Sequence, residues 1–308
     1  MKNVCAVVVT YNRKALLQEC IDAILKQTYA VEKVVILDNN SNDGTEDALK
    51  TAGYLDNERV VFERLSENTG GAGGFHYGMK KASEFSPDWI WIMDDDVVPL
   101  ENCLEELIKA SEVVKEKVSF LASSVRGMKQ EPMNVPKVLK ESTKTYVDWY
   151  RYLEYGMVQI YKATFVSLLI NHEAVKKCGY PWKDFFIWGD DSEYTQRIIR
   201  DYGEAYMVGK SQVIHKRVGA EALSVVKETN KNRIPLYFYY YRNNLIGYWE
   251  YENALYRFLC MGKLGYDFVA VLFKGKYKLA KMKVILKAFF VFVFGMYDKK
   301  GFKNREKL

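Results

Sequence analysis

Three consecutive carboxylates at the end of one apolar segment are the side chains of this sequence best suited to do chemistry. The run from Trp89 to Val97 reads as a buried β-strand that passes directly into Asp94, Asp95 and Asp96. Neighbouring carboxylates repel and raise one another's pKa, so a cation usually neutralises them beside a buried strand. Because side chains alternate along an extended segment, Asp94 and Asp96 face one side and can reach one hard metal ion. A solvated acidic loop is the alternative.

A second pair of carboxylates, Asp190 and Asp191, stands at the start of a predicted helix. A carboxylate at a helix N-terminus satisfies free backbone N–H groups and meets the positive end of the helix dipole. Only one of the two is needed for that purpose, so the other is available as a general base. We predict that Asp191 is the base and that Asp190 caps the helix or orients the pair.

His215 lies on the short run from Val213 to Arg217, about 120 residues after the aspartates. Histidine is a common metal ligand, but a lone histidine is also a common structural or surface residue. Both interpretations stay open for His215. The other two histidines, His76 and His172, have no acidic neighbours in the sequence and are predicted to be structural.

The segment from Gly70 to Gly74 has glycine at four of five positions. We expect it to precede a helix and to let the backbone approach a ligand or turn tightly, with Gly71 and Gly73 as candidate ligand-binding positions. Its spacing matches neither the dinucleotide-binding fingerprint nor the phosphate-binding loop G-x-x-x-x-G-K-[ST]. Nicotinamide-dependent enzymes and P-loop enzymes are therefore not favoured.

An alternation of strands and helices would bring these groups together. Short β-branched runs predict strands at 4–9, 34–37, 60–65 and 89–93, and helical patterns lie at 14–26, 44–52, 74–84 and 101–115. This alternation predicts an α/β fold with parallel βαβ units, in which ligands bind beyond the carboxyl ends of the strands. Polar clusters follow all four strands, at 10–13, 38–45, 68–74 and 94–96. Asp43 and Thr45 are also explained as a turn and a helix cap.

The alternation loosens after about residue 118. An apolar stretch at 162–170, an aromatic loop at 179–189, a helix near 191–201 and extended segments at 205–208 and 212–217 follow without a linker. We therefore predict one catalytic domain over residues 1–220, with its second half forming the opposite wall of the cleft. Residues 221–308 form a C-terminal region that is largely helical over 234–295.

The basic charge of the chain is concentrated in its last 51 residues. Residues 258–308 carry 12 Lys/Arg and 3 Asp/Glu, a net charge of +9, whereas the whole chain has +6, so residues 1–257 are net negative. Aromatic residues lie between the lysines, and 284–297 is almost wholly apolar but too short to span a bilayer. This pattern predicts a helix at an anionic membrane surface, with a core helix or a contact between copies of the chain as alternatives. Without a reading helix or another basic stripe, nucleic acid is not an expected partner.

Five widely spaced cysteines without a C-x-x-C pair are typical of reduced thiols in a cytosolic protein. The N-terminal run Val4 to Val9 continues into Thr10 without a small-residue cleavage site, so we interpret it as a first strand and not a signal peptide.

Taken together, the polar clusters resemble those of inverting glycosyltransferases of family 2, which have the GT-A fold. The resemblance covers about residues 3–220 and is carried by Thr10-Tyr11-Asn12, Asp38, Asp94-x-Asp96, Asp190-Asp191 and His215, in that order. Within the family, the segments 68–75 and 188–194 look most like those of bacterial galactofuranosyltransferases, which use UDP-galactofuranose. Rhamnosyltransferases of bacterial polysaccharide assembly, which use dTDP-rhamnose, share much of the pattern and remain the alternative.

This resemblance implies a role for each residue. Thr10, Tyr11, Asn12, Asp38 and Asn40 would hold the nucleotide, together with the backbone at Gly71 and Gly73, and Asp95 would lie near the sugar or ribose. Asp94, Asp96 and His215 would hold Mn²⁺ or Mg²⁺ on the diphosphate. Asp191 would be the base that activates a hydroxyl of a glycan or lipid-linked glycan, at the inner face of the cell membrane.

The sequence leaves alternatives open for the acceptor site and for the class of protein. Trp182 and Trp188 offer apolar faces for acceptor sugars, but packing of their loop is the favoured interpretation. Asp94-x-Asp96-x-Val98 also matches the pattern of haloacid-dehalogenase-type phosphohydrolases, although there it follows the first strand and here three βα units precede it. A non-catalytic membrane-associated scaffold is a third interpretation.

Overall fold

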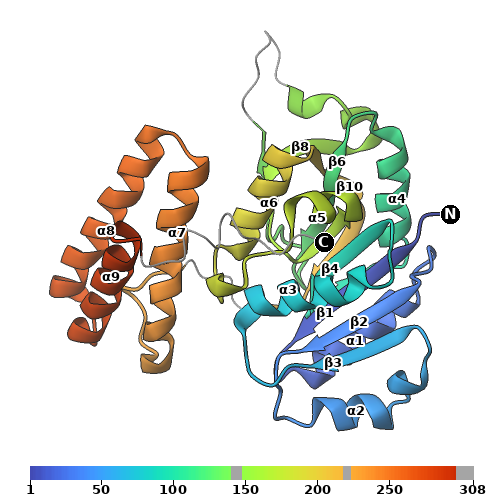
Figure 1. The fold of residues 1–308 in the computed structure, drawn as a ribbon, viewed down its shortest axis with the longest axis horizontal. Helices are drawn as coiled ribbons and strands as arrows, with labels where there is room; N and C mark the ends of the chain where they lie inside the picture. The colour runs from blue at the N-terminus through green and yellow to red at the C-terminus, as the bar shows by residue number, and fades with distance from the viewer. Residues whose placement is uncertain (140–147, 218–222, 296–308) are drawn as a thin grey trace.

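A ten-stranded mixed β-sheet forms the centre of the structure, a computed structural model that describes residues 1–139, 148–217 and 223–295 (Figure 1). The strand order is β3-β2-β1-β4-β9-β6-β10-β8-β7, and β5 pairs with β10. The strands are β1 (Val4–Thr10), β2 (Lys33–Asp38), β3 (Val60–Arg64), β4 (Trp89–Asp94), β5 (Val97–Pro99), β6 (Val118–Arg126), β7 (Lys137–Val138), β8 (Met157–Lys162), β9 (Ser167–Asn171) and β10 (Glu204–His215).

The first four strands are parallel and agree with the predicted βαβ units. Their register sets Thr10 beside Asp38 and Val9 beside Asp94, so the carboxyl ends of β1, β2 and β4 meet at one edge of the sheet. The polar residues that follow these strands therefore converge, as the sequence predicts.

Helices cover both faces of the sheet because alternate side chains of each strand point to opposite faces. Ala6 and Val8 pack with apolar residues of α1 (Lys14–Leu25), α2 (Thr45–Thr51) and α4 (Cys103–Val113). Val7 and Val9 pack with those of α3 (Gly70–Ser83), α5 (His172–Cys178) and α6 (Asp190–Asp201) on the other face. This α/β architecture confirms the predicted fold class.

The second half of the sheet is largely antiparallel. β9 lies between β4 and β6 and runs against both, and β10 runs against β8 and β5. The two extended segments predicted at 205–208 and 212–217 form the single strand β10, whose register shifts between Val208 and Gln212. Its last residue, His215, pairs with Val97 of β5, so β10 ends beside the three aspartates.

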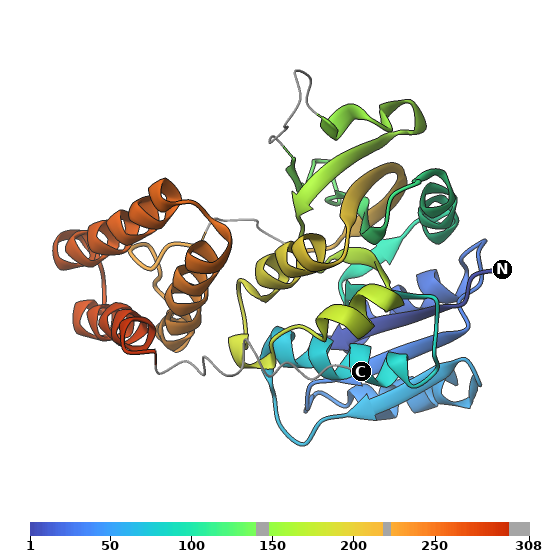
Figure 2. The ribbon, with the colours of Figure 1, turned by 45° about the horizontal axis from the view of Figure 1, so that its top comes forward.

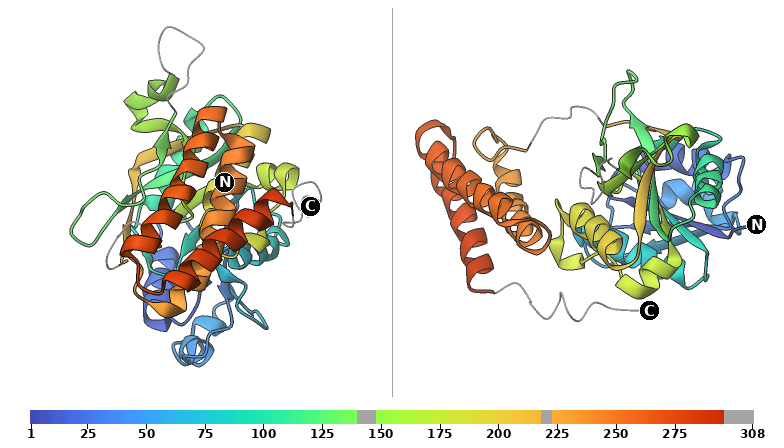
Figure 3. Two further views of the ribbon diagram at one scale, coloured as in Figure 1. Left: turned by 90° about the vertical axis from the view of Figure 1, so that its left-hand side faces the viewer. Right: turned by 90° about the horizontal axis from the view of Figure 1, so that it is seen from above.

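Three helices form a bundle at one side of the sheet (Figure 2 and Figure 3). These are α7 (Tyr237–Tyr251), α8 (Ala254–Lys274) and α9 (Lys278–Val293), which confirms the predicted helical C-terminal region. Tyr241, Val271 and Ile285 are buried at their centre. The buried ammonium group of Lys281 donates to the carbonyl oxygens of Val226 and Glu228, so α9 also holds the segment before α7. None of the helices within the described ranges has the length and apolar character needed to cross a membrane.

Candidate active site

The three aspartates lie where β4 ends: Asp94 is the last residue of the strand, and Asp95 and Asp96 form the turn before β5. The buried carboxylate of Asp95 accepts hydrogen bonds from Thr10 Oγ1 at 2.8 Å and from Arg13 Nη1 at 3.3 Å. Arg13 Nη1 also donates to Asp96 Oδ2 at 2.8 Å. Ligand atoms of Asp94, Asp96 and His215 lie within 4.8 Å of one another. The structure thus assembles the predicted metal-binding set from two distant segments.

His215 is oriented by a residue that sequence reasoning missed. Its Nδ1 atom lies 3.0 Å from Asn134 Oδ1. An amide oxygen can only accept, so Nδ1 donates to Asn134 and Nε2 is the ring nitrogen that faces the aspartates. Nε2 lies 3.1 Å from the buried Asp96 Oδ1.

The donor set therefore fits a divalent cation. Two carboxylates and an imidazole nitrogen within 4.8 Å of one another can share one cation. Carboxylate oxygens suit Mn²⁺ or Mg²⁺, and histidine is a common metal ligand. The hydrogen bond from Nδ1 to an amide oxygen is the outer contact that usually orients a ligating histidine. Among the described residues the Asn134 side chain supplies this contact, and its position in the loop between β6 and β7 left no signal in the sequence.

Electrostatics at this site also favour a bound cation. Burial raises the pKa of Asp94, and the negative charges of Asp96 and Asp95 raise it further. Burial raises the pKa of Asp95 to about 6, against the opposing effect of Arg13. For Asp96, burial is outweighed by His215 and Arg13, which lower its pKa. Arg13 alone therefore does not neutralise the three carboxylates.

Side chains predicted to hold the nucleotide border this site. Asp38 is fully buried; its Oδ1 accepts from the backbone N–H of Ser41 at 2.9 Å, whereas Oδ2 has no hydrogen-bond partner in the part of the chain that is described. Asn40 Oδ1 accepts from Arg64 at 3.2 Å. Asn12 and Asn40 both have positive φ, 55° and 66°, which Asn tolerates better than most residues.

The loops after β1 and β2 are bonded to each other. The backbone N–H of Asn12 donates to Ser41 Oγ at 2.8 Å, and Asn12 Oδ1 accepts from the backbone N–H of Asn42 at 2.7 Å. Tyr11 is exposed at this edge, with 44% of its surface accessible. The two loops therefore form one wall beside the aspartates, with the ring of Tyr11 open to a ligand.

The glycine segment lies inside a helix and not before one. The sequence predicted a helix from residue 74, but α3 begins at Gly70. A Cβ at Gly74 would lie 2.4 Å from the Val9 side chain, so glycine here lets α3 pack closely on β1. A Cβ at Gly73 would lie 2.3 Å from Thr69 Oγ1, whereas one at Gly71 would meet open space. Gly71 is therefore the position in this segment where the backbone is open to a ligand.

The acidic pair stands at the first turn of α6, opposite the aspartates of β4. Gly189 before it has φ of 101°, and Asp191 Oδ1 accepts from the backbone N–H of Ser192 at 2.6 Å. Burial raises the pKa of Asp190 to about 8, and the charge of Asp191 adds to the rise. Asp190 in turn raises the pKa of Asp94 across the site. The two acidic clusters therefore share one electrostatic environment.

Lys162, at the end of β8, faces the same pair. Burial raises the pKa of Asp191, and the backbone N–H of Ser192 and the charge of Lys162 oppose that rise. Burial also lowers the pKa of Lys162 itself. Lys162 could not be recognised from the sequence because β8 follows a long stretch without a clear pattern.

Both tryptophans suggested for the acceptor pack within the protein. The Trp182 ring centroid lies 5.0 Å from that of Phe185, and its Nε1 donates to Asp184. The Trp188 ring lies 5.4 Å from the ring of Tyr237 on α7. Packing of the loop thus accounts for the positions of both rings.

Comparison with known proteins decides the family. The family model described as Glycosyl transferase family 2 matches residues 5–169, more than half of the chain. The chain belongs to glycosyl transferase family 2. This glycosyltransferase is 38% identical over 99 residues to galactofuranosyltransferase GlfT1 of Mycolicibacterium smegmatis, a match that covers 32% of each chain. A match to GlfT1 of Mycobacterium tuberculosis is 34% identical over 101 residues and covers 31% of each chain.

Solved glycosyltransferase structures share the fold of this family member. GalNAc-T7 with UDP, GalNAc and Mn²⁺ has a TM-score of 0.59 at 15% identity, covering 80% of this glycosyltransferase and 52% of that chain. TarS of S. aureus has a TM-score of 0.56 at 16% identity, covering 99% of this chain and 46% of that one. At such identities the likeness concerns the fold. The family assignment separates this glycosyltransferase from the haloacid-dehalogenase-type phosphohydrolases.

Proposed function

We propose that this glycosyltransferase moves galactofuranose from UDP-galactofuranose to a hydroxyl group of a glycan or lipid-linked glycan, with inversion at the anomeric carbon. The observation that carries the proposal is the set Asp94, Asp96 and His215 facing the pair Asp190 and Asp191 in a family 2 fold. The matched regions of the relatives named galactofuranosyltransferase GlfT1 support the choice of sugar.

We assign the donor side to the strand ends. Asp38 and Asn40 after β2, with Thr10, Tyr11 and Asn12 after β1, would hold the nucleotide, and Gly71 would let the backbone approach it. Mn²⁺ or Mg²⁺ held by Asp94, Asp96 and His215 would supply a Lewis acid that stabilises negative charge on the departing diphosphate. Arg13 bridges Asp95 and Asp96 and so keeps both carboxylates in place for the donor.

We assign the base to Asp191 and the orientation of the pair to Asp190. A sugar hydroxyl is a poor nucleophile until a carboxylate within hydrogen-bond distance takes its proton during attack. Burial raises the pKa of Asp191, which makes this carboxylate a better proton acceptor than an exposed one. Attack from the side of α6, opposite the diphosphate at β4, accounts for inversion.

A panel of donors tests the sugar. We expect UDP release from UDP-galactofuranose, in the presence of Mn²⁺ and a galactan-type acceptor, to exceed release from UDP-galactopyranose by about tenfold or more, because the two ring forms place their hydroxyls differently. The measurement is acceptor-dependent nucleotide release, with acceptor omitted as the control. Faster turnover of dTDP-rhamnose would contradict the assignment of galactofuranose and leave the reaction type in place.

We also propose that α8 and α9 bind the anionic inner surface of the cell membrane. Six exposed apolar side chains of α8 are spaced by three, four or seven residues, which places them on one face of the helix: Leu255, Phe258, Leu259, Tyr266, Val269 and Phe273. Exposed lysines flank them on α8 and α9: Lys263, Lys274, Lys278, Lys283 and Lys287. An apolar face with a basic margin matches an anionic lipid surface better than it matches another copy of this basic region.

Vesicle sedimentation tests this surface. We expect Phe258→Glu together with Phe273→Glu in the full chain to reduce binding to vesicles that contain phosphatidylglycerol by about tenfold or more, because both rings are over 70% exposed. Transfer to a soluble acceptor should stay at the wild-type rate. Tyr150→Glu, at an exposed ring far from α8, is the matched control. If the double variant binds vesicles as well as the wild type does but no longer forms a dimer that the wild type forms, these side chains instead make a contact between copies of the chain.

A further inference from the structure

A buried asparagine of the C-terminal bundle holds the loop that precedes the acidic pair. Asn243 of α7 has 2% of its surface exposed. Its Nδ2 atom lies within hydrogen-bond distance of the carbonyl oxygens of Phe185 at 2.9 Å, Ile187 at 3.1 Å and Trp188 at 2.8 Å, so its two N–H groups serve three acceptors and one N–H is shared. One amide group therefore contacts three carbonyl oxygens within four consecutive residues, so the loop wraps around it.

The amide is itself fixed in orientation. Asn243 Oδ1 accepts from Arg242 at 3.0 Å and 2.8 Å, and Arg242 also donates to the carbonyl oxygen of Asp184. With its oxygen held by a guanidinium, the amide can present only its N–H groups to the loop. This arrangement leaves a single orientation for the Asn243 side chain.

The loop has an unfavourable backbone that needs such support. Phe186 has φ of 60°, Trp188 has φ of 62° and Gly189 has φ of 101°. Conformations of this kind cost about 1–3 kcal/mol for a residue with a side chain and persist only where the surroundings hold them. A Cβ at Gly189 would lie 3.2 Å from Asn243 Cβ, so Asn243 also packs directly against the residue before Asp190.

The other side of the loop contacts the donor half of the site. The carbonyl oxygen of Phe186 accepts from the backbone N–H of Ala72 in α3 at 3.1 Å. A Cβ at Gly70 would lie 2.0 Å from the same oxygen, which explains glycine at the start of α3. The loop thus joins the first turn of α3, the first turn of α6 and the middle of α7.

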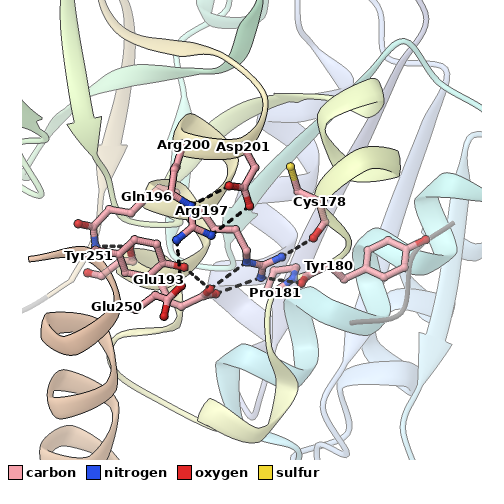
Figure 4. Close-up of polar contacts among 12 residues, drawn as sticks. Cys178, Tyr180, Pro181, Glu193, Gln196, Arg197, Arg200, Asp201, Glu250 and Tyr251 are labelled. Atoms are coloured by element: carbon pink, nitrogen blue, oxygen red, sulfur yellow. Dashed lines mark hydrogen bonds and ion pairs between the residues drawn. The ribbon is translucent and has the colours of Figure 1, made fainter. Parts of the chain in front are cut away.

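A second contact ties α7 to the same turn of α6 (Figure 4). Tyr251, the last residue of α7, donates through its hydroxyl to Glu193 Oε1 at 2.8 Å. Glu193 forms a fully buried ion pair with Arg197 at 2.8 Å, and Arg197 donates to the carbonyl oxygen of Tyr180 at 2.9 Å. The acidic pair therefore lies between two contacts with α7, one before Asp190 and one after Asp191.

We propose that Asn243 is a positioning residue for sugar transfer. By holding the carbonyls of Phe185, Ile187 and Trp188, it fixes Gly189 and hence the direction of the Asp190 and Asp191 side chains relative to the tip of β4. The inference rests on the proposed transfer reaction, and it makes α7 a part of the catalytic unit although the sequence places the boundary of that unit near residue 220.

Substitution of Asn243 in the full chain tests this role. We expect Asn243→Ala to lower kcat of acceptor-dependent UDP release about 30- to 100-fold, because a shift of the base by about 1 Å has effects of this size. The donor KM and the dissociation constant of UDP with Mn²⁺ should stay within about threefold, since the donor side chains are untouched. Asn243→Ser keeps one donor and should give an intermediate kcat.

The neighbouring residue supplies the matched control. Asn244 donates within α7, to the carbonyl oxygen of Tyr240, and we expect Asn244→Ala to keep kcat within about twofold. A wild-type kcat in folded Asn243→Ala would overturn the proposal. Equal losses of kcat and UDP affinity would also overturn it, because they indicate a general loss of structure.

Two further measurements test the proposal if Asn243→Ala does not fold or if the wild-type chain has no transferase activity. If Asn243→Ala does not fold, kcat is measured for Asn243→Ser instead, and a wild-type kcat in that variant overturns the proposal. If the wild-type chain releases no nucleotide from any donor, the proposed function fails. Amide hydrogen exchange then still tests whether Asn243 holds the loop before Asp190. Faster exchange of residues 185–191 in Asn243→Ser than in Asn244→Ala supports it, and equal exchange overturns it.

Discussion

Replacing Asp191 by asparagine is expected to lower kcat of sugar transfer by about 10³-fold while UDP and Mn²⁺ bind as in the wild type. Asparagine has the shape of aspartate but cannot take a proton from the acceptor hydroxyl. The donor side chains and the metal ligands lie on other elements, β1, β2, β4 and β10, and are unchanged. Steady-state kinetics with saturating donor, together with calorimetric titration of UDP, separate the two effects.

Comparison with Asp190→Asn decides which of the two neighbouring carboxylates is the base. If Asp190 only orients the pair, its variant should keep at least about a tenth of the wild-type kcat, well above Asp191→Asn. A larger loss in Asp190→Asn than in Asp191→Asn would reverse the assignment. Wild-type kcat in Asp191→Asn would remove Asp191 from the chemistry altogether.

Stability against pH provides an independent check on Asp190. Its pKa is raised to about 8 in the folded chain, chiefly by burial, so the folded state holds a proton that the unfolded chain loses near pH 4. Stability is then unaffected below about pH 4 and falls as pH rises toward about 8. Asp190→Asn should remove this loss and gain about 4 kcal/mol at about pH 9 relative to pH 5, measured by urea unfolding. Equal pH dependence in both proteins would contradict the raised pKa.

Loss of a metal ligand is the second large effect. We expect Asp94→Asn and Asp96→Asn each to lower transfer on the order of 10³-fold, because several kcal/mol of charge stabilisation on the departing diphosphate would be lost. Chelation should stop the wild-type enzyme, and added Mn²⁺ should restore it. Asp47→Asn, at an exposed carboxylate of α2, is the matched control and should behave as the wild type. Full activity of both variants in chelator would rule out metal-assisted transfer.

The parts of the fold that could be predicted from the sequence depend on local patterns. Strands β1 to β4 are short β-branched runs followed by polar residues, and parallel pairing brings their carboxyl ends to one edge whatever follows. Asp94 and Asp96 could be grouped from the side-chain period of a strand, but in the structure they come together through the turn at Asp95 and Asp96. The start of α6 at Asp190 carries the usual acidic signal of a helix N-terminus.

The remaining parts depend on contacts between distant segments. Nothing in the run 167–171 shows that β9 enters between β4 and β6 in the opposite direction, since a buried strand reads the same either way. Asn134 and Asn243 act through their side chains on residues that lie 81 and 55–58 positions away in the sequence. The helical start at Gly70 was hidden because glycine is a poor helix former, and only the close approach to β1 explains it.

Manganese binding in the presence of UDP, followed by electron paramagnetic resonance of free Mn²⁺, tests the central claim most directly. If the acidic end of β4 and His215 form the cation site of a nucleotide-sugar enzyme, the wild-type chain should take up one Mn²⁺ with UDP, and Asp96→Asn should lose that uptake while remaining folded. Equal Mn²⁺ uptake by the two proteins, or none by the wild type in saturating UDP, would contradict the account.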